Sequence, residues 1–153
     1  MAHTKDFTRS NTQAGDAAVN GLIGGVLAGM LMLVLLILLG LVSGQAPGLV
    51  LGRFSSSQEA LPLRGAMLHL AVSGVYGVLF GLITWLIAPG RRLRTPFWLA
   101  GSVYGLLLWL LAWYVLLPGL DSRLIATPVI HLFLGHLLFG ASLGIIVGRF
   151  EKE

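Results

Sequence analysis

Four long apolar stretches dominate the sequence, and shorter polar segments separate them. The stretches cover about residues 17–42, 63–88, 96–117 and 127–148. An α-helix needs roughly 20 apolar residues to cross the hydrocarbon core of a bilayer, and each stretch meets this length. The stretches are continuously apolar and do not alternate with a period of two, which excludes a β-barrel. The pattern therefore predicts an all-α fold, a bundle of four transmembrane helices.

The segments outside these helices divide the chain simply. Residues 1–16 are polar and lack periodicity, so we expect an N-terminal tail that contains at most a short interfacial helix. Residues 17–149 form the transmembrane domain, and residues 150–153 form a C-terminal tail. The longest connection, from Ser43 to Pro62, is rich in Gly, Ser and Gln. We expect it to fold over the mouth of the bundle.

Lysine and arginine are distributed unevenly between the two ends of the predicted helices. With both termini inside, the outer side carries Arg53, Arg64 and Arg123. The inner side carries Lys5, Arg9, Arg91, Arg92, Arg94, Arg149 and Lys152. Cytoplasmic loops of membrane proteins have an excess of Lys and Arg, so both termini are expected in the cytoplasm. The first apolar stretch is too long for the core of a signal peptide, and we expect a multi-pass protein of the plasma (inner) membrane.

The composition narrows the classes of function. Hydrophobic residues make up 56% of the 153 residues and charged residues 10%, against roughly 25% charged in soluble domains. This excludes an ordinary soluble enzyme and a nucleic-acid-binding module, and it leaves the lipid bilayer and other transmembrane helices as partners. The net charge of +4 comes from loop arginines, which we assign to membrane orientation. Because cysteine is absent, disulfides, thiolate zinc sites and iron–sulfur clusters are excluded.

Small residues recur at four-residue steps in all the predicted helices. Residues i and i+4 lie on one face of a helix, and small side chains there let two helix backbones approach closely. We therefore predict that these positions pack helix against helix. They are Gly21, Gly25, Gly29, Ser73, Gly77, Gly81, Gly101, Gly105, Gly140, Gly144 and Gly148.

The second and fourth helices also share a longer pattern. The frame H-L-x-x-small-x-x-x-G-x-x-x-G begins at His69 and again at His136. The first and third helices both carry glycines at four-residue steps. We therefore predict two repeated helical hairpins, related by a pseudo-two-fold axis along the membrane normal.

Histidines are the ionisable groups at membrane depth, namely His69, His131 and His136. Such groups are either structural or functional. In the structural interpretation, a histidine at the head of a small-residue row donates to a backbone carbonyl across the helix interface. In the alternative, His69 and His136 ligate the iron of haem b or the magnesium of a chlorophyll, with His131 as a further candidate ligand. His131 and His136 are roughly 140° apart around one helix, so they do not suit a shared metal ion.

The chain carries no signature of an enzyme. It lacks nucleotide-binding loops, metalloprotease motifs and a Ser/His/Asp set at plausible depth, so we expect no catalytic residues and no metal site. No Asp or Glu lies well inside a predicted span, which disfavours an ion-coupled exporter. The preferred function is a non-enzymatic membrane protein without a cofactor, which acts through helix packing as an accessory subunit of a larger complex or as a homo-oligomer. The alternatives are a tetrapyrrole-binding electron-transfer or pigment subunit and a small-solute carrier or channel.

The last two predicted helices resemble those of the YagU-like bacterial inner-membrane proteins. The likeness is carried by Val129–Gly148, with His131, Gly135-His136-Leu137, Gly140 and Gly144, and by Ala100–Gly105 in a helix ending near Pro118-Gly119. It covers about the last two-thirds of the chain, and the chain departs from it in shorter outer loops and an early glycine-rich helix. The resemblance implies a polytopic inner-membrane protein and, since that family has no established chemistry, no particular activity.

Overall fold

Helices make up almost all of the protein, and the described residues contain no β-strand. The computed structural model describes residues 3–55, 61–87, 96–119 and 122–150. Within these residues, 4 helices are long and apolar enough to cross a membrane. They are Gln13–Val42, Pro62–Ile87, Phe97–Gly119 and Val129–Phe150. The predicted all-α fold with four transmembrane helices in a bundle is confirmed.

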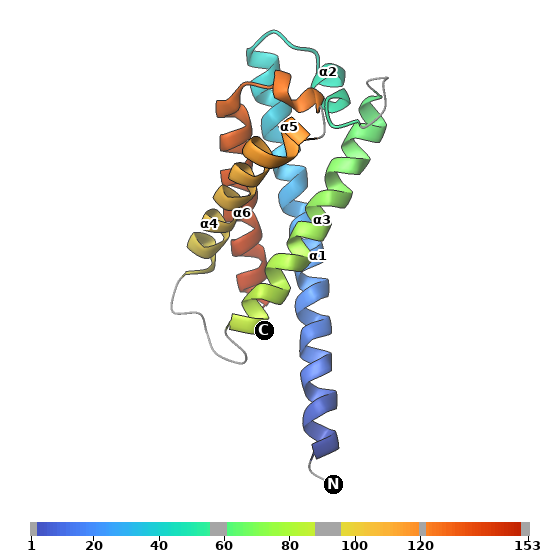
Figure 1. Cartoon of the computed structure of the whole chain (residues 1–153), viewed down its shortest axis with the longest axis vertical. Helices are drawn as coiled ribbons and strands as arrows, with labels where there is room; N and C mark the ends of the chain where they lie inside the picture. The colour runs from blue at the N-terminus through green and yellow to red at the C-terminus, as the bar shows by residue number, and fades with distance from the viewer. Residues whose placement is uncertain (1–2, 56–60, 88–95, 120–121, 151–153) are drawn as a thin grey trace.

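The first helix, α1 (His3–Val42), is longer than expected. It begins at His3 rather than near Ala17, so most of the segment expected to be a separate polar tail is helical and continuous with the first span. No proline interrupts the segment, and Gly15 alone does not end a helix that the apolar stretch after it propagates. The N-terminal part of α1 projects beyond the other helices, at the end opposite α2 (Figure 1).

The remaining helices form two pairs. α3 (Pro62–Ile87) packs along α1, and α4 (Phe97–Leu111) packs along α6 (Val129–Phe150). Contacts between α1 and α6 join the two pairs (Figure 1). The core at this junction contains Ala28, Met32 and Leu36 from α1 and Phe139, Leu143 and Val147 from α6.

The close contact within each pair depends on glycine. A Cβ atom added to Gly25 would overlap the carbonyl group of Ser73, and one added to Gly101 would overlap the carbonyl group of Gly140. Eight of the glycines predicted to pack helices lie against a backbone carbonyl of the facing helix: Gly21, Gly25, Gly77 and Gly81 between α1 and α3, and Gly101, Gly105, Gly140 and Gly144 between α4 and α6. Gly29 and Gly148 lie against the side chains of Ser73 and Phe97. Ser73 itself lies against Gly29. The two pairs thus make similar contacts, while their origin as a repeat stays a prediction.

The connection after α1 folds back onto the bundle. α2 (Pro47–Gly52) begins with a proline, which is favoured at the first position of a helix. Its Val50 is buried beside Gly40 of α1, and the carbonyl group of Leu51 lies against Gly65 of α3. α2 therefore covers the end of the α1–α3 pair, as the sequence analysis expects of this connection (Figure 1).

The third transmembrane helix changes its winding near this same end. α4 passes into a π-helical turn, η1 (Ala112–Leu116), and then into α5 (Leu117–Gly119). A 3₁₀ turn, η2 (Arg123–Ala126), follows, and the hydroxyl of Ser122 accepts a hydrogen bond from the backbone N–H of Leu124 at its start.

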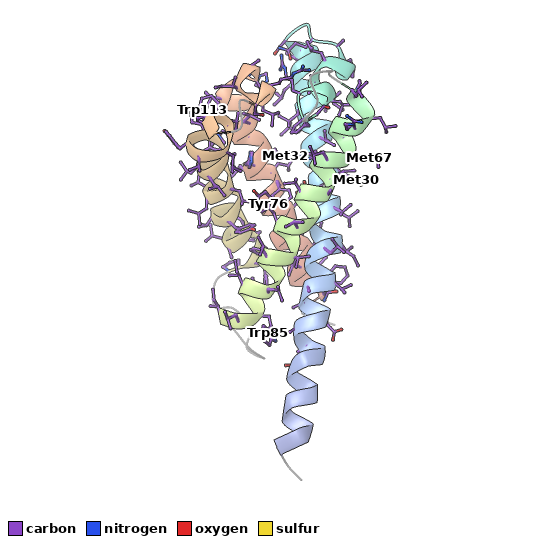
Figure 2. All side chains as sticks on the ribbon, turned by 45° about the vertical axis from the view of Figure 1, so that its right-hand side comes forward. Met30, Met32, Met67, Tyr76, Trp85 and Trp113 are labelled. Atoms are coloured by element: carbon purple, nitrogen blue, oxygen red, sulfur yellow. The ribbon has the colours of Figure 1, made fainter. Side chains whose placement is uncertain are left out.

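Several residues used for the orientation prediction lie outside the described part of the chain. They are Arg91, Arg92, Arg94 and Lys152. Trp85 and Trp113 lie at opposite ends of the bundle, as expected of interfacial aromatic residues (Figure 2). Which end faces the cytoplasm stays a prediction.

Candidate functional site: a cavity between the helix pairs

A cavity of about 740 Å³ lies between α3 and α4, near the end of the bundle that α2 covers. This volume is within the range of about 300–1,000 Å³ that is usual for small-molecule sites. Its lining includes Met32 on α1, Val72 on α3, Leu108 on α4 and Phe139 on α6. Figure 2 labels three of its lining residues, Met32, Tyr76 and Trp113, which come from α1, α3 and the π-helical turn.

The cavity follows from the pairing of the helices. α3 is held to α1 and α4 to α6 by the glycine contacts, so neither α3 nor α4 is drawn against the other. They meet at Tyr104 of α4, whose hydroxyl donates a 2.9 Å hydrogen bond to the carbonyl oxygen of Tyr76 on α3. The ring of Tyr104 also lies 5.2 Å from that of Phe80. The cavity is the space between α3 and α4 that extends from this contact towards α2.

The π-helical turn supplies part of the cavity wall. Ala112, Trp113 and Leu116 belong to this turn, and all three line the cavity. A π-helical turn inserted in an α-helix changes the direction of the side chains that follow it, and such turns occur frequently at functional sites. The winding of the third helix therefore sets which side chains face the space.

His69 lines the cavity but is engaged in holding two helices together. It is buried, and its Nε2 donates to the carbonyl oxygen of Gly29 on α1 over 3.2 Å. The hydroxyl oxygen of Ser73 lies 3.5 Å from the same nitrogen. The ring of Phe54 meets the imidazole edge-on, with centroids 4.7 Å apart. This is the cross-interface hydrogen bond that the structural interpretation of the histidines predicts.

His136 lines the same cavity with a different arrangement. Its Nδ1 donates to the carbonyl oxygen of Leu132, one turn earlier on α6, over 2.8 Å. That bond leaves Nε2 as a hydrogen-bond acceptor, and no described residue occupies it. The structure therefore brings His69 and His136 to one cavity. His131 is half-exposed and does not line it.

A positively charged end distinguishes this cavity from a purely apolar space. Arg53, just after α2, and Arg123, on η2, both line it. Arg53 is half-buried, and its Nη1 donates to Oε1 of Gln45 over 3.0 Å and to Oγ1 of Thr127 over 3.3 Å. Both acceptors are neutral. The cavity thus combines apolar walls with guanidinium groups at one end.

In the sequence, these two arginines indicate only the orientation of the chain in the membrane, and no pattern assigns them to a site. A signal for Arg53 was present, because an apolar run, Leu49–Leu51, interrupts the polar connection just before it. Such a run predicts an element that packs back onto the bundle and brings its neighbours with it. No comparable signal marks Arg123, since its position depends on how the connection before α6 folds.

The described residues contain no group of three or more His, Cys, Asp or Glu side chains that could hold a metal ion. The polar groups of the cavity can form hydrogen bonds and recognise charge. They include two guanidinium groups and a free imidazole nitrogen.

Four apolar helices make this chain a small multi-pass membrane protein. It belongs to the DUF6789 family, a family of unknown function, whose model matches residues 15–153. No curated protein and no solved structure matches the chain. The resemblance to the YagU-like proteins stays a prediction.

Proposed function

We propose that this protein is a non-enzymatic membrane protein that binds an amphipathic molecule, taken from the bilayer, in the cavity between α3 and α4. The observation that carries the proposal is the division of the cavity into two regions. Leu68, Val72 and Phe139 belong to its apolar region, whereas Arg53 and Arg123 are charged and come from the connections at the end of the bundle. A molecule with an apolar tail and a polar head matches both regions.

The position of the cavity supports entry from the membrane. Leu68 and Val72 line it from α3 and remain 39% and 42% exposed. They belong to a helix that is long and apolar enough to span the bilayer, so any surface that they expose outside the cavity would face lipid tails. An acyl chain can therefore enter sideways without crossing water. With the predicted orientation, the charged end lies at the outer leaflet.

The contacts of the histidines favour this proposal over a tetrapyrrole site. If both histidines ligated a tetrapyrrole metal, His69 would have to bind it through Nδ1, because its Nε2 already donates to the carbonyl oxygen of Gly29. In His136, by contrast, Nε2 has no hydrogen-bond partner among the described residues. A Soret band in the purified protein that disappears in His136→Ala would support the tetrapyrrole alternative, and an uncoloured protein that carries lipid would support ours.

The extent of the cavity favours binding over conduction. Its lining residues reach Tyr76, near the middle of α3, and Leu108, near the middle of the third span, Phe97–Gly119. The hydrogen bond from Tyr104 to Tyr76 and the ring contact with Phe80 join the helices at this level. Within the described residues, the lining of the cavity therefore stops at this level, and a carrier or channel would need these contacts to break.

The accessory-subunit role predicted from the sequence is compatible with a bound amphiphile. The third span, Phe97–Gly119, has 17% of its most apolar window buried, against 39% for the first and fourth spans. This helix offers the largest free surface for a neighbouring subunit or a second copy. Co-purification from native membranes, with and without cross-linking on this helix, tests the role.

The proposed function is tested by the material that purifies with the protein. The wild-type chain, Val72→Trp and Val75→Trp are extracted with organic solvent, and the extracts are quantified by mass spectrometry. Val72 lines the cavity, whereas Val75, on the same helix, is exposed and does not. We expect one amphiphile enriched to about one molecule per chain in the wild type and in Val75→Trp, and lost in Val72→Trp. Equal amounts in all three proteins would contradict the proposal.

A further inference from the structure

We propose that the molecule bound in this cavity is an anionic lipid whose phosphate lies against the guanidinium group of Arg53. This inference rests on the proposed function and names the chemical class of its ligand. It depends on three features of the structure: the donors of Arg53 that have no partner among the described residues, the way the side chain is held, and the apolar character of the rest of the cavity.

The donors of Arg53 that have no partner in the described part of the chain form one side of its guanidinium group. Arginine has five N–H donors in a planar fork, and the two on Nη1 are directed to Gln45 and Thr127. The donors on Nη2 and Nε have no partner among the described residues. Together these form the edge that binds phosphate or carboxylate oxygens through two parallel hydrogen bonds.

The guanidinium group of Arg53 is positioned by the protein rather than left to solvent. Gln45 precedes α2, and Thr127, which is buried, precedes α6. Through Nη1, Arg53 therefore joins its own connection to Thr127, which lies 74 residues further along the sequence. A side chain used only to mark the membrane interface would extend towards water. Here two neutral acceptors hold it half-buried in a cavity wall.

The charge of Arg53 has no counterion in the described part of the cavity. A half-buried charge bound only to neutral groups is less stable than one paired with an anion. An anionic group is therefore the ligand chemistry that this end of the cavity favours.

Because the rest of the cavity is apolar, the head group determines which lipid the cavity prefers. The tail of a lipid gains little by moving from the bilayer into the cavity, because lipid tails are as apolar as the residues that line it. Discrimination among membrane lipids then comes from the polar end. A phosphate lipid accepts hydrogen bonds from Arg53 and also fills the apolar region with its chains. A soluble phosphate can do only the first.

The test compares two lipids that differ only in the phosphate. Purified protein in a neutral detergent is titrated with dioleoyl phosphatidic acid and with dioleoylglycerol, and bound lipid is measured by native mass spectrometry. We expect wild-type protein to prefer phosphatidic acid about tenfold or more, as for loss of one hydrogen-bonded charge pair. Arg53→Gln should lose this preference and still bind dioleoylglycerol. Arg64→Gln is the matched control, because Arg64 is exposed and does not line the cavity, and it should keep the preference.

The possible outcomes separate this inference from the proposed function. Equal binding of the two lipids to the wild type would overturn the phosphate assignment and leave an amphiphile site in place. Binding of neither lipid, together with no enriched amphiphile in the extract, would overturn both. A phosphate preference that Arg64→Gln removes as fully as Arg53→Gln would show a general surface charge effect and overturn the assignment. Competition by millimolar inorganic phosphate would identify a soluble anion, not a lipid, as the ligand.

Discussion

The imidazole of His69 on α3 donates from Nε2 to the carbonyl oxygen of Gly29 on α1 over 3.2 Å, which ties two helices together. His136 begins the same sequence frame on α6, yet its Nδ1 bonds to Leu132 within its own helix. One histidine thus joins a helix pair, and the other lines the cavity with an Nε2 that has no partner among the described residues. Two histidines with the same local sequence pattern have different structural environments.

This difference predicts unequal effects on stability. His69→Ala removes an interhelical hydrogen bond and the ring contact with Phe54, whereas His136→Ala removes only a bond within α6. We expect the free energy of unfolding to fall by about 1 kcal/mol more for His69→Ala than for His136→Ala. Unfolding titrations in mixed detergent micelles measure the difference. Equal losses would show that the bond to Gly29 contributes nothing.

The glycine contacts predict a second pair of effects. Gly25→Ala and Gly101→Ala each place a methyl group onto a backbone carbonyl of the facing helix, so each should lower the free energy of unfolding by about 1–3 kcal/mol. Gly15→Ala is the control, because nothing lies within 4 Å of its added Cβ. It should leave stability unchanged or raise it by up to about 1 kcal/mol, because alanine favours helix. Wild-type stability in Gly25→Ala would refute the packing of α1 against α3.

The contact between Tyr104 and Tyr76 predicts a change in the separation of α3 from α4. Tyr104→Phe removes the hydroxyl that donates to the carbonyl oxygen of Tyr76, at a cost of about 1 kcal/mol. Because the chain has no cysteine, spin labels can be attached to introduced cysteines at the exposed Val75 and Val103. We expect a broader and longer distance distribution in Tyr104→Phe. Tyr114→Phe, at an exposed position on the third helix, should leave the distribution as in wild type.

The orientation is open to the same labelling approach. Ser43→Cys lies at the end covered by α2, and Arg149→Cys lies at the opposite end of α6. If both termini are cytoplasmic, a membrane-impermeant maleimide added to intact cells labels Ser43→Cys and reaches Arg149→Cys only after permeabilisation. The reverse pattern would place the charged end of the cavity at the inner leaflet.

Much of the fold is predictable from the sequence because its determinants are local. The stretch expected over residues 63–88 is the helix Pro62–Ile87, and the stretch over 127–148 is Val129–Phe150. Length and apolar content decide the spans, and the four-residue steps decide which helix faces come together. The start of α1 at His3 was not predictable from apolar content, because a helix can continue into a polar segment that contains nothing to end it.

The cavity could not be predicted, because it depends on how the two helix pairs are placed. The sequence pattern singles out His69 and His136 as a pair, and both line the cavity. No local sequence feature, however, predicts the space between α3 and α4. The π-helical turn at Ala112–Leu116 has no marker in the sequence, although it turns Trp113 to the cavity. Arg53 reaches the site only through the fold of α2 and its bond to Thr127.

The most direct test of the account is to map where lipid chains contact the protein. The purified chain is reconstituted with a phosphatidic acid that carries a photoactivatable diazirine in one acyl chain, irradiated, and digested for mass spectrometry. We predict saturable adducts at the cavity residues Val72 and Leu116, which excess unlabelled phosphatidic acid prevents, and only non-saturable adducts at the outward-facing Val75 and Val103. Adducts of equal yield and equal competition at all four positions would show that lipid merely surrounds the helices and that the cavity holds none.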